Sequence, residues 1–77
     1  MAKPYKYREL IRALKDHDAR FEFHDRRGKG SHRMIYHPDV NGRAVSFPVK
    51  YHGENTELRK GVISDVIRHF NLPEDLL

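Results

Sequence analysis

Apolar residues near the N-terminus recur at the spacing of one helix face. The positions i, i+3, i+4 and i+7 are apolar, and charged residues lie between them on the other side. The apolar positions are Tyr7, Leu10, Ile11 and Leu14. The pattern predicts a first helix that starts after Pro4, packs this stripe on the core, and ends at Asp16-His17-Asp18.

A second apolar stripe follows in the last third of the chain. Its members are Leu58, Val62, Ile63, Val66, Ile67 and Phe70. We expect Thr56 to be the N-cap of this helix, and Asn71 and Pro73 to end it. Gly61 costs a helix interior up to ~1 kcal/mol relative to alanine. Gly61 therefore indicates either close backbone packing or a helix that starts nearer to Gly61 than to Thr56.

Between the helices, three stretches alternate as half-buried strands do. The predicted strands are residues 20–24 with Phe21 and Phe23 inward, residues 31–37, and residues 43–49 with Val45, Phe47 and Val49 inward. Pro38 should stop the second strand, and Asn41-Gly42 is a tight-turn signal before the third. Pro48 marks either an edge strand or a strand end.

The order of elements is α-β-β-β-α, an α+β fold. Two helices with one apolar stripe each must cover one face of a three-stranded antiparallel sheet. The other face is left for solvent or a partner. The 77 residues are enough for one domain, residues 1–77, with a thin core.

Charge is distributed unevenly along the chain. Fifteen Lys and Arg against eleven Asp and Glu give a net charge of +4, a modest bias toward polyanions. Residues 26–33 contain four cations and no acid. The chain has no cysteine, and we see neither a signal peptide nor a membrane-spanning run. We therefore expect a soluble, cytoplasmic protein.

Residues 28–38 join this basic loop to an apolar strand, with His32 at the junction. Gly28 and Gly30 allow the backbone to approach a ligand closely. Lys29 and Arg33 add charge on either side of His32, and an imidazole titrates near neutral pH. This arrangement indicates a site that faces phosphate and contains a group able to transfer protons.

The chain resembles the HicA family of toxin–antitoxin mRNA interferases over nearly its whole length. The resemblance rests on Glu9-Leu10-Ile11, on Lys29-Gly30-Ser31-His32 followed by His37-Pro38, on Val45-Ser46-Phe47-Pro48, and on Leu58-Arg59-Lys60-Gly61. Each string is short, but their order in so short a chain is fairly specific. Two departures, a longer stretch from Phe21 to Gly28 and Asp18-Ala19 in place of a glycine, bear on loop shape and RNA preference.

The resemblance implies a fold like the double-stranded-RNA-binding domain and an endoribonuclease that cuts mRNA without a metal or other cofactor. It also implies inhibition by a HicB-type antitoxin, in a hetero-oligomer with a toxin that is monomeric alone. His32 falls on the catalytic histidine of the family, and Gly30 and Ser31 on the flanking motif.

RNA cleavage by its own 2′-hydroxyl requires a base, an acid and stabilisation of charge on the phosphate. His32 can serve as base or acid, and the turn backbone with Lys29 and Arg33 can hold phosphate oxygens. His37 lies five residues from His32, so on a regular strand the two side chains point to opposite faces. We therefore favour a structural role for His37, although a bulge could restore the pairing. His52 is the alternative second group.

The remaining histidines, His17, His24 and His69, are interpreted as surface residues, and the histidine spacing matches no zinc signature. Contacts to the RNA backbone are expected from Arg26, Arg27, Lys29, Arg33, Lys50, Arg59 and Lys60. Arg59 and Lys60 fall in the first turn of the second helix, where the helix dipole disfavours cations. That placement suits RNA binding better than stability.

Two other functions remain open from the sequence. One is a non-catalytic RNA-binding module in which His32 only contacts phosphate. The other is a protein-interaction domain whose basic face meets an acidic partner.

Overall fold

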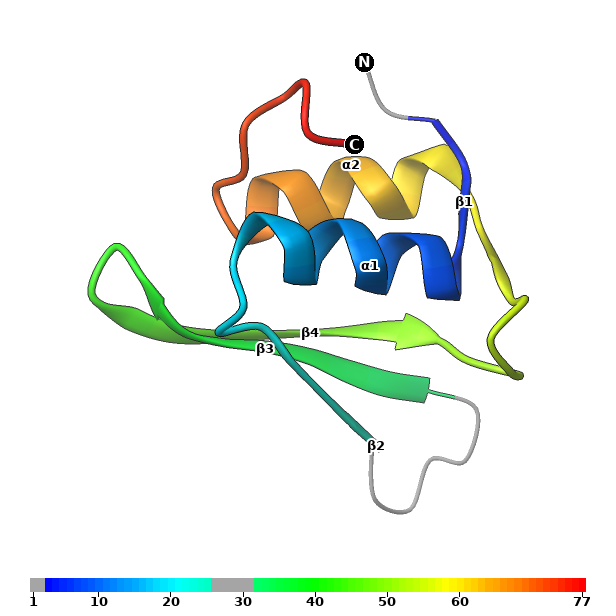
Figure 1. The fold of residues 1–77 in the computed structure, drawn as a ribbon, viewed down its shortest axis with the longest axis horizontal. Coiled ribbons are helices and arrows are strands. Elements are labelled where there is room, and N and C mark those ends of the chain that lie inside the picture. The colour runs from blue at the N-terminus through cyan, green and yellow to red at the C-terminus, as the bar shows by residue number, and fades with distance from the viewer. Residues whose placement is uncertain (1–2, 26–31) are drawn as a thin grey trace.

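The computed structural model describes residues 3–25 and 32–77. The elements are β1 (Tyr5–Lys6), α1 (Tyr7–His17), β2 (Glu22–Asp25), β3 (His32–Val40), β4 (Arg43–Lys50), β5 (Glu57–Leu58) and α2 (Lys60–His69). The strands β2, β3 and β4 form an antiparallel sheet in that order, and β1 pairs with β5. Both helices lie on one side of the three-stranded sheet (Figure 1). The predicted α+β architecture is confirmed.

The core lies between the two helices and the covered face of the sheet. The buried apolar residues are Tyr7, Leu10, Leu14, Phe21, Ile35, Val49, Leu58, Ile63, Val66, Phe70 and Leu77. Both predicted helix stripes thus supply core residues, and Val45, Phe47 and Val49 of β4 turn toward the core as expected. Phe21 is buried just before β2 begins, not within a strand.

The two strand prolines behave differently from one another. Pro38 does not end β3, which continues to Val40, so that prediction is wrong. The pairing register with β4 shifts between His37 and Val40. Because of this irregularity, the sheet does not need a backbone hydrogen bond from Pro38, which has no N–H to donate. Pro48 lies opposite Met34 in β4, which is an edge strand of the sheet that the structure describes. The edge interpretation of Pro48 is confirmed.

The hairpin between β3 and β4 closes through Asn41-Gly42 as predicted. Asn41 has φ 54° and Gly42 has φ 84°. Two successive residues with positive φ define the two-residue hairpin turn whose twist matches that of the flanking strands. Asn71, with φ 53°, adopts the left-handed conformation expected just after α2.

Thr56 is not the N-cap of α2, which begins four residues later at Lys60 with Arg59 as its N-cap. The Thr56 hydroxyl instead holds the preceding turn. It donates to the Gly53 carbonyl oxygen at 2.8 Å and accepts from the His52 N–H at 2.7 Å. Leu58, expected in the helix, is buried in β5.

The pairing of β1 with β5 was not predicted, because two-residue strands leave no pattern in a sequence. Tyr5 lies opposite Leu58, and Lys6 opposite Glu57. The Tyr7 N–H also donates to the Thr56 carbonyl oxygen at 2.8 Å. These bonds attach the start of α1 to the segment that leads into α2.

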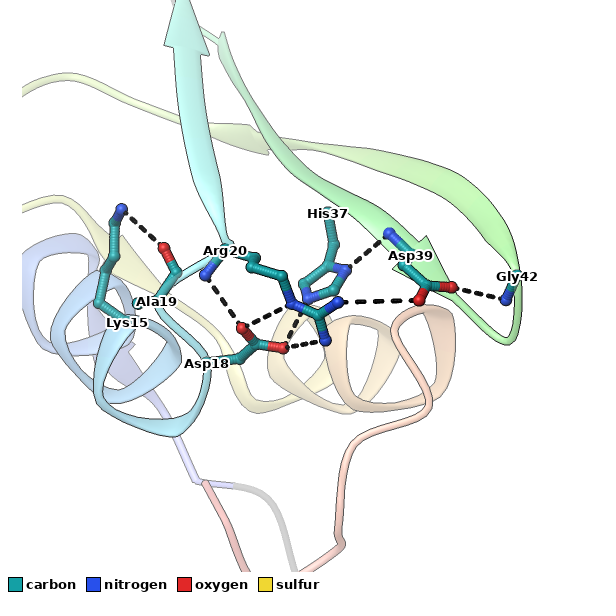
Figure 2. A network of polar contacts seen from close by, with 7 residues as sticks. All are labelled: Lys15, Asp18, Ala19, Arg20, His37, Asp39 and Gly42. Carbon is teal, nitrogen blue, oxygen red and sulfur yellow. Dashed lines mark hydrogen bonds and ion pairs between the residues drawn. The ribbon is translucent and has the colours of Figure 1, made fainter.

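His37 is buried at 3% exposure and joins α1 to the hairpin (Figure 2). Its Nδ1 accepts the Asp39 N–H at 3.0 Å, so its Nε2 carries the proton that is donated to Asp18 Oδ2 at 2.8 Å. Asp18, at the C-cap of α1, also accepts two side-chain hydrogen bonds from Arg20, at 3.2 and 3.0 Å. The structural role favoured for His37 is therefore confirmed.

We predict that Gly61→Ala raises the free energy of unfolding by ~0.4–1 kcal/mol, because alanine restricts the unfolded chain and suits the helix. Gly61 is the second residue of α2. No described atom beyond its neighbours and the helix backbone lies within 4 Å of the added Cβ. Urea unfolding measures the change. Gly42→Ala is the control and should lose stability, because its φ is 84°. Loss of stability in Gly61→Ala would contradict the open environment.

We predict that Asp18→Asn removes part of the acid sensitivity of the fold. Hydrogen bonds from Arg20, and then from His37, hold the pKa of the Asp18 carboxyl well below its ordinary range. The carboxylate therefore stabilises the fold above pH ~4, and this contribution is lost as the pH falls toward the folded-state pKa. In thermal unfolding measured from pH 7 to pH 2.5, the difference in melting temperature between wild type and variant should become smaller as the pH falls.

Asp75→Asn, in the exposed C-terminal tail, is the control for the loss of a carboxylate. A gap between wild type and Asp18→Asn that stays constant with pH would show that the Asp18 charge does not stabilise the fold.

Candidate functional site

His32 is the first residue of β3 and is exposed. Side chains alternate along a strand, and Ile35 and His37 are buried toward the helices. His32 belongs to the other set of the alternation. It pairs in register with Lys50, the last residue of β4. The predicted catalytic residue is thus accessible at the end of the sheet.

His32 lines a groove of about 390 Å³ where β4 ends and β5 leads into α2. The other residues that line it are Phe47, Pro48, Val49, Lys50, Glu57, Leu58, Arg59 and Val62. We call this the His32 groove. It brings together His32, Lys50 and Arg59, three residues that the sequence analysis assigned to catalysis or RNA contact. Lys60, also predicted, is exposed and follows directly as the first residue of α2.

The N-terminal ends of both helices lie at the same end of the molecule as the start of β3 (Figure 1). The two helices differ in the capping contacts and in the charge of their first turns. In α1, the Glu9 carboxylate accepts the Lys6 N–H at 2.8 Å and places a negative charge in the first turn. The first turn of α2, which is fully described, has no acidic residue, and the Arg59 side chain makes no capping bond. The α2 end is therefore positive and suits an anion.

Arg33, predicted to bind substrate, has well-defined partners within the protein. Its Nε donates to Asp25 Oδ1 at 2.8 Å, and its guanidinium carbon lies 4.0 Å from the centre of the Tyr51 ring. Burial raises the pKa of the nearby Tyr7 phenol, and the positive charge of Arg33 opposes that shift. These contacts join the start of β3 to β2 and to Tyr51, so they favour a structural role for Arg33.

Lys29, Gly30 and Ser31 lie outside the described residues, together with Arg26 and Arg27. Their assignment as phosphate contacts stays a prediction. In the sequence, Ser31 immediately precedes His32.

His52 rather than His37 lines a groove that adjoins the His32 groove. His37 is enclosed in the network at the hairpin and contacts Asp18. His52 is exposed and lines an adjoining groove of about 460 Å³, which shares Lys50 and Glu57 with the His32 groove. Glu57 was missed by the sequence analysis, since the two-residue strand β5 that contains it leaves no pattern in a sequence.

The remaining histidines are exposed, as predicted. The His24 Nε2 lies 2.9 Å from Glu22 Oε1. The ring of His69 lies 4.9 Å from that of Phe47, and its Nε2 donates to the Ser46 carbonyl oxygen at 3.1 Å. His69 thereby packs against a residue that lines the His32 groove.

Residues 3–25 and 32–77 contain neither a cluster of metal ligands nor a membrane-spanning helix. No three His, Asp or Glu side chains gather there as a metal ion requires. No helix in the described part of the chain is long and apolar enough to cross a membrane.

The helices α1 and α2, which flank β2, β3 and β4 in the chain and lie on one face of their sheet, define a small α+β domain. A family model described as the HicA toxin of bacterial toxin–antitoxin systems matches residues 7–72 of the 77. The chain therefore belongs to the HicA family and is the toxin of a toxin–antitoxin pair, which implies an antitoxin partner. Neither the curated proteins nor the solved structures gave a significant match.

Proposed function

We propose that this toxin is a metal-independent endoribonuclease that cleaves mRNA, with His32 as its proton-transfer group. The observation that carries the proposal is the position of His32. It is exposed in a groove with Lys50 and Arg59, beside the positive end of α2.

The reaction proceeds by attack of a ribose 2′-oxygen on the adjacent phosphorus atom. Neutral His32 accepts the proton of the 2′-hydroxyl, the 2′-oxygen–phosphorus bond forms, and the bond from phosphorus to the 5′-oxygen breaks. A second group returns a proton to the 5′-oxygen, and a cyclic phosphate remains on the other fragment. Acid–base catalysis of this kind contributes ~10²–10⁴-fold.

Negative charge develops on the phosphate oxygens during this step, and positively charged side chains at the site stabilise it. Lys50 and Arg59 line the groove, and Lys60 begins the adjacent helix. We assign Lys29, Gly30 and Ser31 to the same phosphate, through the backbone and the lysine ammonium group. Electrostatic stabilisation in such sites is usually the largest contribution to the rate.

The second proton transfer falls to His52. His52 lines the groove that adjoins the His32 groove. His37 is excluded from this role by its burial and its bond to Asp18.

The antitoxin that we propose is of the HicB type. It forms a hetero-oligomer with a toxin that is monomeric alone, in the cytoplasm, where mRNA is found.

The alternative function is that of a non-catalytic RNA-binding module. The same basic groove supports it, because the fold and the cations would bind RNA without any proton transfer.

We predict that His32→Ala lowers the rate of RNA cleavage ~10²–10⁴-fold. RNA binding should persist, because Lys50, Arg59 and Lys60 remain. Cleavage of a labelled transcript, with and without a chelator, measures the rate and its independence from metal. Induction in cells should no longer arrest growth.

His17→Ala is the matched control, since His17 is exposed at the C-terminal end of α1, away from the groove. Its cleavage rate should equal that of the wild type. Binding of RNA without cleavage by the wild type would favour the non-catalytic module.

We predict that Arg59→Ala or Lys60→Ala weakens RNA binding equally across RNA sequences. Each also reduces the slope of log K against log salt by ~0.7, the value for one lost phosphate contact to a single strand. Fluorescence anisotropy at several salt concentrations measures both effects. Arg43→Ala removes the same charge at the hairpin, at the other end of β4, and should leave the slope unchanged. Equal slopes in all variants would contradict a phosphate contact at the α2 end.

A further inference from the structure

We propose that the His32 groove holds one unpaired nucleobase of the RNA, next to the phosphate that is cleaved, and that it prefers a base with an amino group. The inference rests on the proposed function, because His32 defines which phosphate is cleaved. It adds a subsite for one base and a residue that distinguishes between bases, Glu57.

The size of the groove suits one nucleotide. Its volume of about 390 Å³ lies in the lower part of the ~300–1,000 Å³ range of small-ligand sites. A single base and its sugar can be accommodated in a space of this size.

The apolar part of the lining suits the face of a base. Phe47, Val49, Leu58 and Val62 provide it, and Phe47 and Val62 are only half-buried. The Phe47 ring is held by the ring of His69, which is itself fixed by its bond to the Ser46 carbonyl oxygen. Bases stack on aromatic side chains with little regard to sequence. A fixed aromatic ring in a groove is therefore a suitable platform.

The charged part of the lining suits the rest of a nucleotide. Lys50 and Arg59 provide positive charge for the phosphate beside His32. A purely apolar ligand would not interact with these two cations. An anionic ligand with an apolar body would contact both the charged and the apolar side chains of the lining. A nucleotide is such a ligand.

Glu57 is the acidic residue of the groove lining, and it gives the groove a means to distinguish bases. An ionised carboxylate only accepts hydrogen bonds. Carboxylates accept from the amino group of cytosine, and adenine and guanine also carry amino groups. Uracil has none, so we expect it to bind least well.

Entry of the base requires that it be unstacked and unpaired. Sequence-specific proteins read RNA mostly in single strands, loops and bulges for this reason. The fold alone would suggest a reader of duplex RNA, but the groove indicates a single strand at the cleaved position.

Binding is tested with short oligonucleotides that carry a 2′-O-methyl group at the cleaved position, so that no reaction occurs. Val62→Trp fills the groove from α2, and Glu57→Gln removes the charge of the carboxylate and keeps its shape. Ala44→Trp is the control, because Ala44 is exposed on β4 and does not line the groove. Circular dichroism establishes that each variant is folded.

We expect Val62→Trp to weaken single-strand binding ~5- to 150-fold, the range for loss of base stacking, and Ala44→Trp to bind as the wild type does. Glu57→Gln should reduce the preference for cytosine over uracil, with little loss of affinity for uracil. A fully paired duplex should compete poorly.

Equal RNA affinity in Val62→Trp and Ala44→Trp would overturn the inference. Loss of antitoxin binding with RNA binding intact in Val62→Trp would overturn it as well. Both results leave the proposed function standing as long as His32→Ala abolishes cleavage. Conversely, a wild-type protein that cleaves nothing but binds single strands in a manner sensitive to Val62→Trp would refute the nuclease and support the groove.

Discussion

The alternation of side chains along β3 determines both the stability of this domain and the position of its candidate catalytic group. Ile35 and His37 point toward the helices and are almost fully buried. A slip of one residue in the register with β4 would exchange the two faces, placing His32 inward and exposing the core residues. Because the buried set must stay buried, His32 stays exposed at the start of β3, in register with Lys50. The core thus positions the imidazole.

The two ends of the sheet serve different purposes. At the hairpin end, the His37–Asp18 pair joins the last turn of α1 to β3, with Arg20 and Asp39 completing the network (Figure 2). At the other end, cations gather near the start of α2. Arg59 and Lys60 occupy a helix N-terminus that disfavours them, whereas α1 uses Glu9 at the equivalent place. Such a concentration of positive charge is explained better by an anionic ligand than by stability.

Much of the fold could be predicted because it depends on local patterns. The helix stripes, the alternating strands and the Asn41-Gly42 turn each follow from spacing or from backbone conformation. The β1–β5 pair and the true start of α2 depend on tertiary contacts instead. Thr56 has the chemistry of an N-cap, but its hydroxyl bonds the Gly53 carbonyl oxygen, so the helix starts later. Pro38 failed as a stop signal because the ladder shifts around it.

The candidate site also has a part that local sequence predicts and a part that depends on tertiary contacts. His32 could be named from its sequence context, and the parity of β3 separated it correctly from His37. The groove could not be predicted, because it is built by β4, β5 and the start of α2, which meet only in the folded chain. Glu57 illustrates the point, since nothing in its neighbourhood in the sequence marks it. It lies in β5, opposite Lys6 of β1, and lines the same groove as His32. The candidate site thus depends on two-residue strands that leave no pattern in the sequence.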